Sequence, residues 1–509
     1  MLPLQGSDRD WLDSPPASSK GRWLSRFAAG SALFLSVHAL LKLYSHATTV
    51  VTPPPYQAPS IPNEPAYPPT YSDYHWAELQ LPQHHWDQTH PAGGEKFFFV
   101  AGHTKGLGWG NALQEHLLNA YLAYVSGRIL VFENYTWADD GSLFSEWNGK
   151  LIPSQIPYTA LIRGPTVGEP LALGVYEPLA VSREYFNHLC PRKTTLRRNQ
   201  VHSKLRSPHS AFDITERWMS VLQATEDPCV ESAVTDSDPI YTHTNVFGIR
   251  SSLRDLWPSL AASPIITEFG WSHLVELAFD TNRALLLPHA SHMDPLLTST
   301  HFTANAERYT PIPGLMAIHV RRGDYAEHCN YLAGMYEDFV SVNAFPYFPD
   351  PFTVPSRSAA SLSALDNEEH YRQRCFPSVE EIAEKIARVR ATPEGRDVRK
   401  LYIMTNGNQA FIDELKTAVW ALGAWDAVSS SRDMVLNWEQ KYVAQAVDML
   451  IAQRAQVLYT SHPGFVGDLV ITQTTGRYLG PPPSPGSSGT AGPLQMWKLF
   501  WPCETREPR

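Results

Sequence analysis

An apolar run in the second half of the chain ends in two adjacent arginines, a glycine and an aspartate. Residues 315–325 read LMAIHVRRGDY. An apolar run of this length before a Gly-Asp turn predicts a buried strand, of the kind found in parallel sheets. In open α/β sheets, ligands bind outside the carboxyl ends of the strands, where we expect Arg321 and Arg322. Two guanidinium groups at that position favour an anionic ligand, and their fork geometry suits a phosphate.

The alternation of side chains along a strand separates the two arginines. His319 and Arg321 fall on one face, and Arg322 falls on the other. We therefore expect Arg321 to meet the ligand and an internal carboxylate to hold Arg322. Asp324 can cap the turn or hold a guanidinium. A buried structural ion pair at the strand end is the alternative interpretation.

Regular α/β alternation continues toward the C-terminus. Apolar runs at 400–404 and 456–459 predict two further strands, and polar loops follow them. Because the carboxyl ends of parallel strands meet at one edge of a sheet, these loops are expected to share one crevice with Arg321. The polar residues that follow the two strands are Thr405, Asn406, Ser461 and His462. Any one of them alone is more often part of a turn than a ligand contact.

Helices are predicted at 268–287, 378–390, 409–422, 437–454 and 466–475. Ser378 and Glu381 form a capping box at the start of the helix predicted at 378–390. Between Tyr325 and Cys375 we expect an irregular insertion rich in proline and serine.

A glycine-rich loop lies between a predicted strand at 96–101 and a predicted helix at 112–126. Its glycines are Gly106, Gly108 and Gly110. A strand, glycine loop and helix in this order receive anions well. A second strand at 128–132 ends at Glu133, which suggests a dinucleotide fold with Glu133 on the ribose.

The spacing of the glycines argues against a dinucleotide site. Asn111 occupies the third position of the glycine fingerprint, and Trp109 would crowd a pyrophosphate. The loop can instead face the other half of the protein, where Asn111 and Lys105 offer polar contacts. A tight turn with no further role is the remaining interpretation.

The N-terminal region predicts a membrane anchor. Residues 27–41 carry no formal charge, and Lys20, Arg22 and Arg26 precede them. This asymmetry predicts a signal anchor with a cytosolic N-terminus and a lumenal body, and a cleaved signal peptide is the alternative. The proline-rich residues 51–91 predict an extended stalk. Asn134 begins an Asn-Tyr-Thr glycosylation motif, which is usable only in the lumen.

The charge and cysteine content of the chain disfavour two further classes of protein. The net charge of −10 gives no support for a nucleic-acid binder. The five cysteines form no CxxC pair, so a structural zinc site is not expected and at most two disulfides can form within the chain. Asp236 and Asp238 form an Asp-x-Asp pair that can hold a metal for a sugar nucleotide, but their surroundings favour a solvated loop.

Four segments together resemble the GDP-fucose-dependent protein O-fucosyltransferases and α1,6-fucosyltransferases. They are IHVRRGDY at 318–325, GLGWGN at 106–111, LYIMTN at 401–406 and AVDMLIAQRAQVLYTSHPGF at 446–465. The resemblance implies an α/β protein of GT-B type, with two Rossmann-like domains facing a central cleft. It also implies an inverting reaction that generally needs no metal, a GDP-fucose donor bound by the second domain, and a protein or glycan acceptor.

The resemblance assigns roles to individual residues. Arg321 would contact the diphosphate, and Asn111 would lie near the reaction centre. The resemblance assigns no general base, and His103 and Glu115 are the candidates in this sequence. Without a base, departure of GDP, helped by Arg321, would have to lead bond formation. The residues expected to line the donor site are His319, Arg321, Arg322, Asp324, Thr405, Asn406, Ser461, His462 and Phe465.

The expected organisation has six parts. They are a cytosolic tail (1–26), a signal anchor (27–44), a stalk (45–94), an acceptor-side domain (95–290), a nucleotide-sugar domain (291–480) and a flexible tail (481–509). This places the protein in the Golgi or the endoplasmic reticulum as a single-pass type II membrane protein, or outside the cell if the N-terminal segment is cleaved.

Two other classes of function remain open. The group often has Thr-Asp at 405–406 and a different segment at 461–465, so a non-catalytic lumenal protein that binds GDP or a glycan is possible. A nucleotide-dependent oxidoreductase is supported only by the glycines at 106–110 and by Glu133.

Overall fold

The computed structural model describes residues 65–85, 94–103, 105–169, 180–205, 209–233, 239–241, 253–287, 295–323, 325–336, 352–356 and 364–460. All of them belong to one compact unit, Asn63–Arg509. Several predictions lie outside the described residues: the anchor at 27–44, Asp236, Asp238, Asp324, Ser461, His462, Phe465, the helix at 466–475 and the tail at 481–509.

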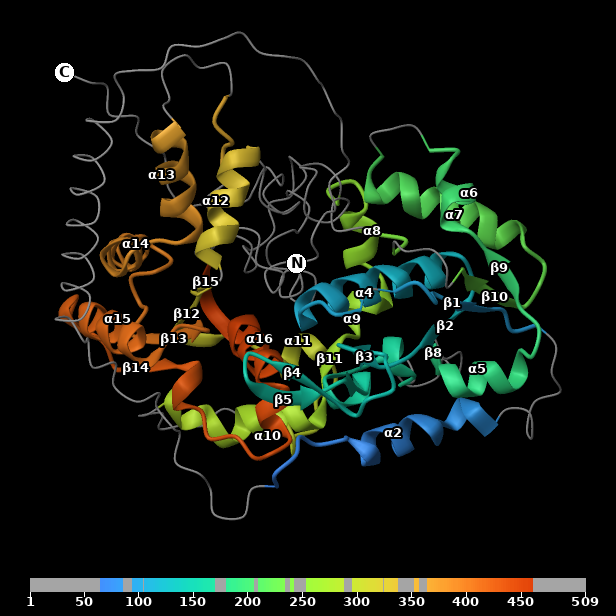
Figure 1. The fold of residues 1–509 in the computed structure, drawn as a ribbon. Helices are drawn as coiled ribbons and strands as arrows, with labels where there is room; N and C mark the ends of the chain where they lie inside the picture. The colour runs from blue at the N-terminus through green and yellow to red at the C-terminus, as the bar shows by residue number, and fades with distance from the viewer. Residues whose placement is uncertain are drawn as a thin grey trace, which may run out of the picture. The chain divides into compact units, whose positions relative to one another are not determined.

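Five parallel strands form the first sheet, in the order β8–β2–β1–β10–β9 (Figure 1). The strands are β1 (Phe97–Phe99), β2 (Ile129–Phe132), β8 (Ala180–Ser182), β9 (Thr194–Leu196) and β10 (Cys229–Ser232). Helix α4 (Trp109–Val125) connects β1 to its neighbour β2. The predicted strand, glycine loop, helix and strand of this region are confirmed.

Both faces of the first sheet are covered, which explains the three consecutive phenylalanines of β1. Phe98 packs against Trp218 of α7 (Ala211–Ala224), with the ring centroids 6.0 Å apart. Phe97 and Phe99 point to the other face and pack against Phe186 of α5 (Arg183–Leu189). A strand buried on both faces reads as a continuous apolar run rather than as an alternating one.

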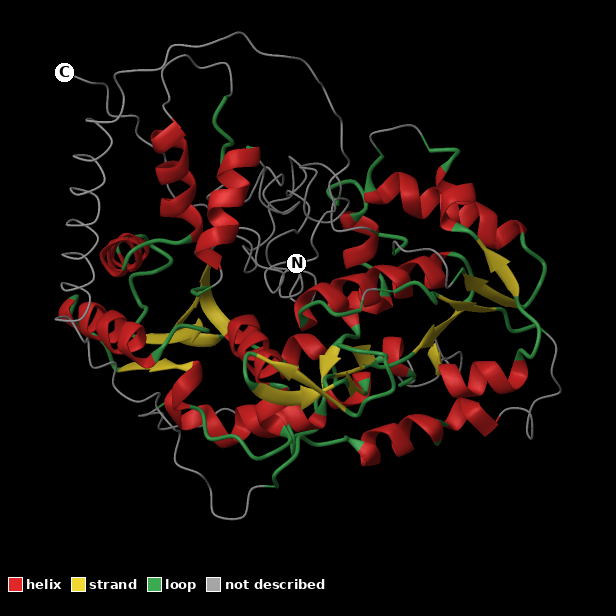
Figure 2. Cartoon of the chain, viewed as in Figure 1, coloured by secondary structure: helices red, strands yellow, loops and turns green. Residues whose placement is uncertain are grey.

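Four parallel strands form the second sheet, in the order β14–β13–β12–β15. The strands are β12 (Ile312–Val320), β13 (Lys400–Thr405), β14 (Ala427–Ser430) and β15 (Ala455–Thr460). The strands predicted at 315–320, 400–404 and 456–459 are therefore immediate neighbours. Helices α14 (Val379–Arg390) and α15 (Gln409–Ala421) pack on one face, and α16 (Ala444–Arg454) packs on the other. Figure 2 shows these strands and helices.

The remaining elements are short. The helices are α6 (Arg198–His202), α8 (Trp257–Ala261), α9 (Pro264–Thr267) and α11 (Asn305–Arg308). Three small antiparallel pairs join β3 (Tyr135–Thr136) to β6 (Gln155–Ile156), β4 (Phe144–Trp147) to β5 (Lys150–Pro153), and β7 (Ile162–Arg163) to β11 (Gly270–Trp271). The 3₁₀ turns are η1 (Pro82–His85), η2 (Tyr158–Ala160), η3 (Pro165–Val167), η5 (Arg283–Leu285), η7 (Ser431–Asp433) and η8 (Gln440–Tyr442).

Local hydrogen bonds explain two helices that begin later than predicted. The helix expected at 268–287 is α10 (His273–Asn282), because Ser272 caps it and β11 precedes it. The helix expected at 437–454 starts only at Ala444. There, Asn437 and Gln440 exchange two backbone-to-side-chain hydrogen bonds of 3.0 and 2.8 Å, which close a 3₁₀ turn before the helix. The capping box of Ser378 with Glu381 is confirmed.

The predicted irregular insertion is wrong in part. It contains α12 (Tyr325–Met335) and α13 (Ala364–Cys375), which pack against each other and are joined by a disulfide between Cys329 and Cys375. Helix α13 exposes charged residues and buries few apolar ones, so its helical period is weak in the sequence. A second disulfide joins Cys190 to Cys229.

The two sheets share one hydrophobic core. Leu113 and Leu117 of α4 and Ala446 and Val447 of α16 all belong to it. A buried hydrogen bond of 2.6 Å also runs from the Trp271 indole to Gln453. Within the described ranges, no helix is both long and apolar enough to cross a bilayer.

Part of the predicted stalk is folded against the body. Residues 65–85 contain α2 (Ser72–Leu79) and η1, and Tyr71 is only 2% exposed. The Tyr71 hydroxyl donates to the Glu439 carbonyl at 2.7 Å, and Glu78 accepts from the backbone and side chain of Thr159. The expectation of extended chain is therefore wrong here, because one apolar and several polar side chains find partners on the body.

Glu78 gives this contact a measurable pH dependence. Burial raises its pKa from 4.5 to about 7, although the hydrogen bonds from Thr159 oppose the rise. The folded state then binds more protons than the unfolded state between these pH values, so the free energy of unfolding falls as the pH rises from 4.5 to 7. In Glu78→Gln we expect this fall to disappear, with a gain of at most about 3 kcal/mol at pH 8. Denaturant unfolding across this pH range checks it.

The exposed Glu414 supplies the control for that measurement. Glu414→Gln should leave the pH dependence of unfolding unchanged. Parallel pH profiles for Glu78→Gln and the parent chain would contradict the assignment.

Candidate functional site

The two adjacent arginines at the end of β12 have different surroundings. The Arg322 side chain is buried, with its guanidinium 4.6 Å from the Phe376 ring centroid and 4.2 Å from the Phe411 ring centroid. It also donates to the Pro377 carbonyl at 2.5 Å. The expectation that a carboxylate holds Arg322 is corrected: two aromatic rings and a carbonyl contact it, and the Glu381 carboxylate acts on it through its charge. Burial lowers its pKa to about 10, which still leaves it charged at neutral pH.

Arg321 is exposed, and its guanidinium lies 5.0 Å from the Tyr325 ring centroid. His319, two residues earlier, is half-buried. Burial, and to a smaller extent the charge of Arg321, lowers the pKa of His319 to about 3, so this imidazole is neutral. A solvent-accessible cation therefore stands at the carboxyl end of a central strand, as the sequence predicts.

Thr405 and Asn406 hold the loop that carries Arg321. Asn406 accepts a hydrogen bond from the Arg322 backbone nitrogen at 2.7 Å and donates to the Arg322 carbonyl at 3.0 Å. The Thr405 hydroxyl donates to the Val320 carbonyl at 2.5 Å. These bonds fix the loop, and a direct nucleotide contact by either residue stays a prediction.

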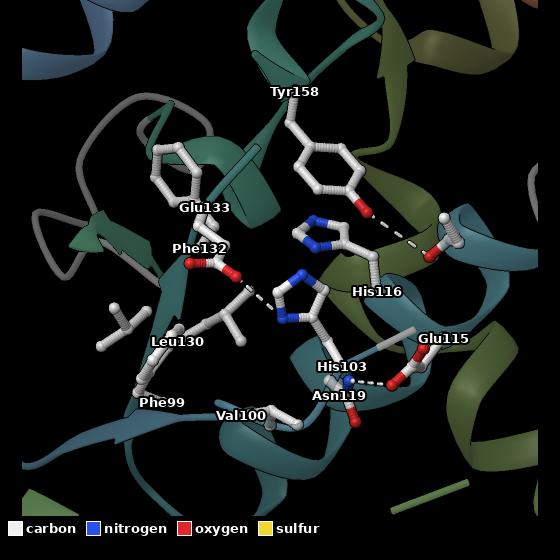
Figure 3. Close-up of a pocket in the computed structure, with 12 residues that line it drawn as sticks. Phe99, Val100, His103, Glu115, His116, Asn119, Leu130, Phe132, Glu133 and Tyr158 are labelled. Atoms are coloured by element: carbon white, nitrogen blue, oxygen red, sulfur yellow. Dashed lines mark hydrogen bonds and ion pairs between the residues drawn. The ribbon is translucent and has the colours of Figure 1, made fainter. Parts of the chain in front are cut away.

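A small cavity lies at the carboxyl ends of β1 and β2, against α4 (Figure 3). Its volume is about 30 Å³, which is room for one or two water molecules. The polar residues that line it are His103, Glu115, His116, Asn119, Glu133 and Tyr158. The carboxyl end of a parallel sheet is where a ligand site is expected.

His103 and Glu133 form the central pair of this cavity. The Nδ1 atom of His103 lies 2.9 Å from one carboxylate oxygen of Glu133 (Figure 3). The other oxygen accepts from the Arg183 guanidinium at 2.5 Å. Both oxygens of Glu133 are therefore used within the chain, which disfavours Glu133 as a ribose ligand.

Three polar atoms at this cavity are buried and have no hydrogen-bond partner among the described residues. They are Nε2 of His103, Nε2 of His116 and Oδ1 of Asn119. The His116 ring stacks on Tyr158 with the centroids 4.2 Å apart, and burial lowers its pKa to about 3. Leaving a buried polar atom unpaired costs about 1–3 kcal/mol, so each of the three favours a hydrogen-bond partner in the cavity, such as a hydroxyl group or a water molecule.

The glycine-rich loop follows His103 in the chain and leads into α4. Contacts of its own residues hold it in place. Gly106 has a φ of 67°, which favours glycine, and its nitrogen donates to the Thr136 carbonyl. Lys105 pairs with Asp139 at 2.7 Å. Gly108 precedes the first turn of α4, and Gly110 lies within that turn.

Asn111 begins a polar stripe along α4. Asn111, Glu115 and Asn119 are four residues apart, which places them on one side of the helix. Asn111 is half-buried, whereas Glu115 and Asn119 are buried, and the amide of Asn119 donates to Glu115 at 3.5 Å. The four-residue spacing of this stripe is the signal that could have located Asn119 in the sequence, and no such spacing marks His116.

Two further predictions concern surface and metal chemistry. The amide of Asn134 donates to Gln155, and its glycosylation stays a prediction. In the part of the chain that the structure describes, no three His, Cys, Asp or Glu side chains are grouped as metal ligands would be.

Comparison with known proteins finds similarity at the level of structure. No family model and no curated protein matches the chain. Solved structures of POFUT1 cover 75% of this chain. The complex with GDP has 14% identity, a TM-score of 0.40 and 95% coverage of that chain. The complex with GDP-fucose has 13% identity, a TM-score of 0.39 and 94% coverage of that chain. The apo form has 14% identity, a TM-score of 0.38 and 96% coverage of that chain.

The two parallel sheets confirm the α/β class, while the central cleft stays an expectation. Similarity at this level carries no argument about activity, which depends on the site itself.

The two arginines should differ in their effect on stability. Arg322→Ala removes two cation–π contacts and a buried hydrogen bond, so we expect the free energy of unfolding to fall by about 2–4 kcal/mol. Arg321→Ala truncates an exposed side chain, so its contacts are screened by solvent and the substitution should cost less than about 1 kcal/mol. Denaturant unfolding of both variants checks this, and equal losses would contradict the division of roles.

Proposed function

We propose that this protein is a glycosyltransferase that moves fucose from GDP-fucose to a hydroxyl of a protein or glycan, with inversion. The observation that carries the proposal is the position of Arg321. Its guanidinium is exposed at the carboxyl end of β12, which lies between β13 and β15 in a parallel sheet. A cation at this place suits a diphosphate.

The loop around Arg321 supports the proposal because it is preorganised. Arg322 is fixed below it by Phe376 and Phe411, and Asn406 fixes its backbone. An arginine on a loop held in this way does not need to reorganise when negative charge develops on the leaving diphosphate. It would therefore do the work for which many sugar-nucleotide enzymes use a metal ion, and no metal is required in the proposal.

The choice of GDP and fucose rests on the resemblance of residues 318–325 and 401–406 to the fucosyltransferase group. The proposed location is the lumen of the Golgi or the endoplasmic reticulum, reached through the predicted anchor at 27–44. The disulfides Cys190–Cys229 and Cys329–Cys375 support an oxidising compartment.

A second candidate is a lumenal protein that binds GDP or a glycan without turnover. The observation that favours it is the use of Thr405 and Asn406 as internal supports of the β12 loop. Binding and turnover therefore have to be measured separately.

The first test is calorimetric binding of GDP to the purified full-length chain. We expect GDP to bind and chelator to leave the binding unchanged. Because a charge-assisted hydrogen bond contributes about 1.5–3 kcal/mol, Arg321→Ala should weaken GDP roughly 10- to 100-fold. Arg321→Lys should also weaken it, since lysine lacks the bidentate fork.

Arg396 provides the matched control, because its side chain is 73% exposed and lies beside Asp397. Arg396→Ala should bind GDP as the parent chain does. A preference for UDP that requires metal would contradict the proposal and turn attention to Asp236 and Asp238. Binding of GDP without hydrolysis of GDP-fucose would favour the second candidate, and binding of NAD alone would favour an oxidoreductase.

A further inference from the structure

We propose that His103, held by Glu133 and Arg183, is the base that removes the proton from the hydroxyl to which the sugar is transferred. The inference rests on the proposed function and adds the group that activates the acceptor. Arg321 would act on the leaving group, and His103 would act on the nucleophile.

The hydrogen bond to Glu133 decides which nitrogen of His103 can accept a proton. A carboxylate can only accept, so Nδ1, at 2.9 Å from Glu133, carries the ring hydrogen. The lone pair is then on Nε2, on the side of the ring away from Glu133 (Figure 3). Arg183 fixes Glu133 in turn, and its guanidinium lies 5.2 Å from the Phe99 ring centroid. A base oriented by a second group is the arrangement that proton abstraction requires.

The cavity presents acceptors to its guest. Nε2 of His116 is an acceptor because the other nitrogen of that ring bonds the Thr166 backbone. Oδ1 of Asn119 is an acceptor by its chemistry, and the carboxylate of Glu115 lines the same space. With Nε2 of His103, these groups suit a guest that donates hydrogen bonds. A hydroxyl group or a water molecule fits a space of about 30 Å³.

The charges around His103 keep it able to accept a proton at neutral pH. Burial lowers its pKa and the carboxylate of Glu133 raises it; Lys105 lowers it, a hydrogen bond to the Val100 backbone raises it, and Arg183 lowers it. His116 and Glu115, from α4, line the same cavity. The imidazole is therefore neutral before the reaction, and Glu133 stabilises the imidazolium that forms.

The second nitrogen of His103 distinguishes it from a histidine that only holds Glu133. A histidine that serves only to hold Glu133 needs one nitrogen, and its second nitrogen would be solvated or bonded. Here Nε2 of His103 is buried and has no partner within the described ranges. The same holds for Nε2 of His116, which is 8% exposed. A donor in the cavity, from a hydroxyl group or a water molecule, would satisfy both atoms.

The reaction step balances as a single displacement. The acceptor oxygen forms a bond to the anomeric carbon while the bond from that carbon to the diphosphate oxygen breaks. The hydroxyl proton passes to Nε2 of His103, and the electron pair of the broken bond leaves with GDP. The proton on His103 is later released to solvent.

The test measures hydrolysis of GDP-fucose by the full-length chain, with water as the acceptor. His103→Gln should keep GDP affinity within about twofold and lower the hydrolysis rate by about 10²- to 10⁴-fold, the range that general-base catalysis supplies. Azide is an anionic nucleophile that needs no proton removal, so it should restore turnover in His103→Gln. It should not restore turnover in Arg321→Ala.

A second variant keeps the proposal testable if His103→Gln folds poorly. Glu133→Gln removes the charge that raises the pKa of His103, so the acidic limb of the pH–rate profile should move to lower pH while the rate falls. The exposed His188 supplies a control, and His188→Gln should match the parent chain.

The outcomes separate the two proposals. Parent-like hydrolysis by His103→Gln, a loss without azide rescue, or an unmoved acidic limb in Glu133→Gln would overturn the role of His103 while leaving the glycosyltransferase intact. A parent chain that neither binds GDP nor hydrolyses GDP-fucose would overturn the proposed function, and the role of His103 with it.

Discussion

The buried parallel pairing of β12 with β13 and β15 is the constraint on which the donor side of the molecule depends. Parallel strands end at the same edge of a sheet, so residues that are far apart in the sequence are brought to one place. The register pairs Val320 with Thr405, and this pairing puts Asn406 within hydrogen-bonding distance of the Arg322 backbone. Without that register, Arg321 would stand on an unsupported loop.

The sequence predicts those features of the fold that depend on local patterns. The three strands of the second sheet and the glycine loop of the first follow from apolar runs and turn residues, and Ser378 with Glu381 marks a helix start. Prediction from the sequence fails where contacts between residues far apart in the chain determine the local structure. Residues 65–85 read as a stalk because proline is frequent there, yet Tyr71 and Glu78 find partners at Glu439 and Thr159.

The candidate site shows the same division. Strand alternation separates Arg321 from Arg322 correctly, because that depends on the backbone alone. It does not identify what holds Arg322, because Phe376 and Phe411 come from other parts of the chain. Similarly, His103 and Glu133 are visible as single residues near strand ends. Their pairing depends on β1 lying beside β2, and no spacing in the sequence expresses it.

The two sheets offer complementary chemistry, which is why the proposed reaction uses both. A displacement at an anomeric carbon needs positive charge where the diphosphate leaves and a lone pair where the hydroxyl attacks. The second sheet presents an exposed, permanently charged arginine, which is suited to a large anion. The first sheet presents a half-buried histidine, and burial lowers the pKa of its imidazole. The degree of solvation thus separates the two roles. The exposure that lets Arg321 reach a phosphate would leave a histidine partly protonated. The burial that lowers the pKa of His103 would oppose a permanent charge.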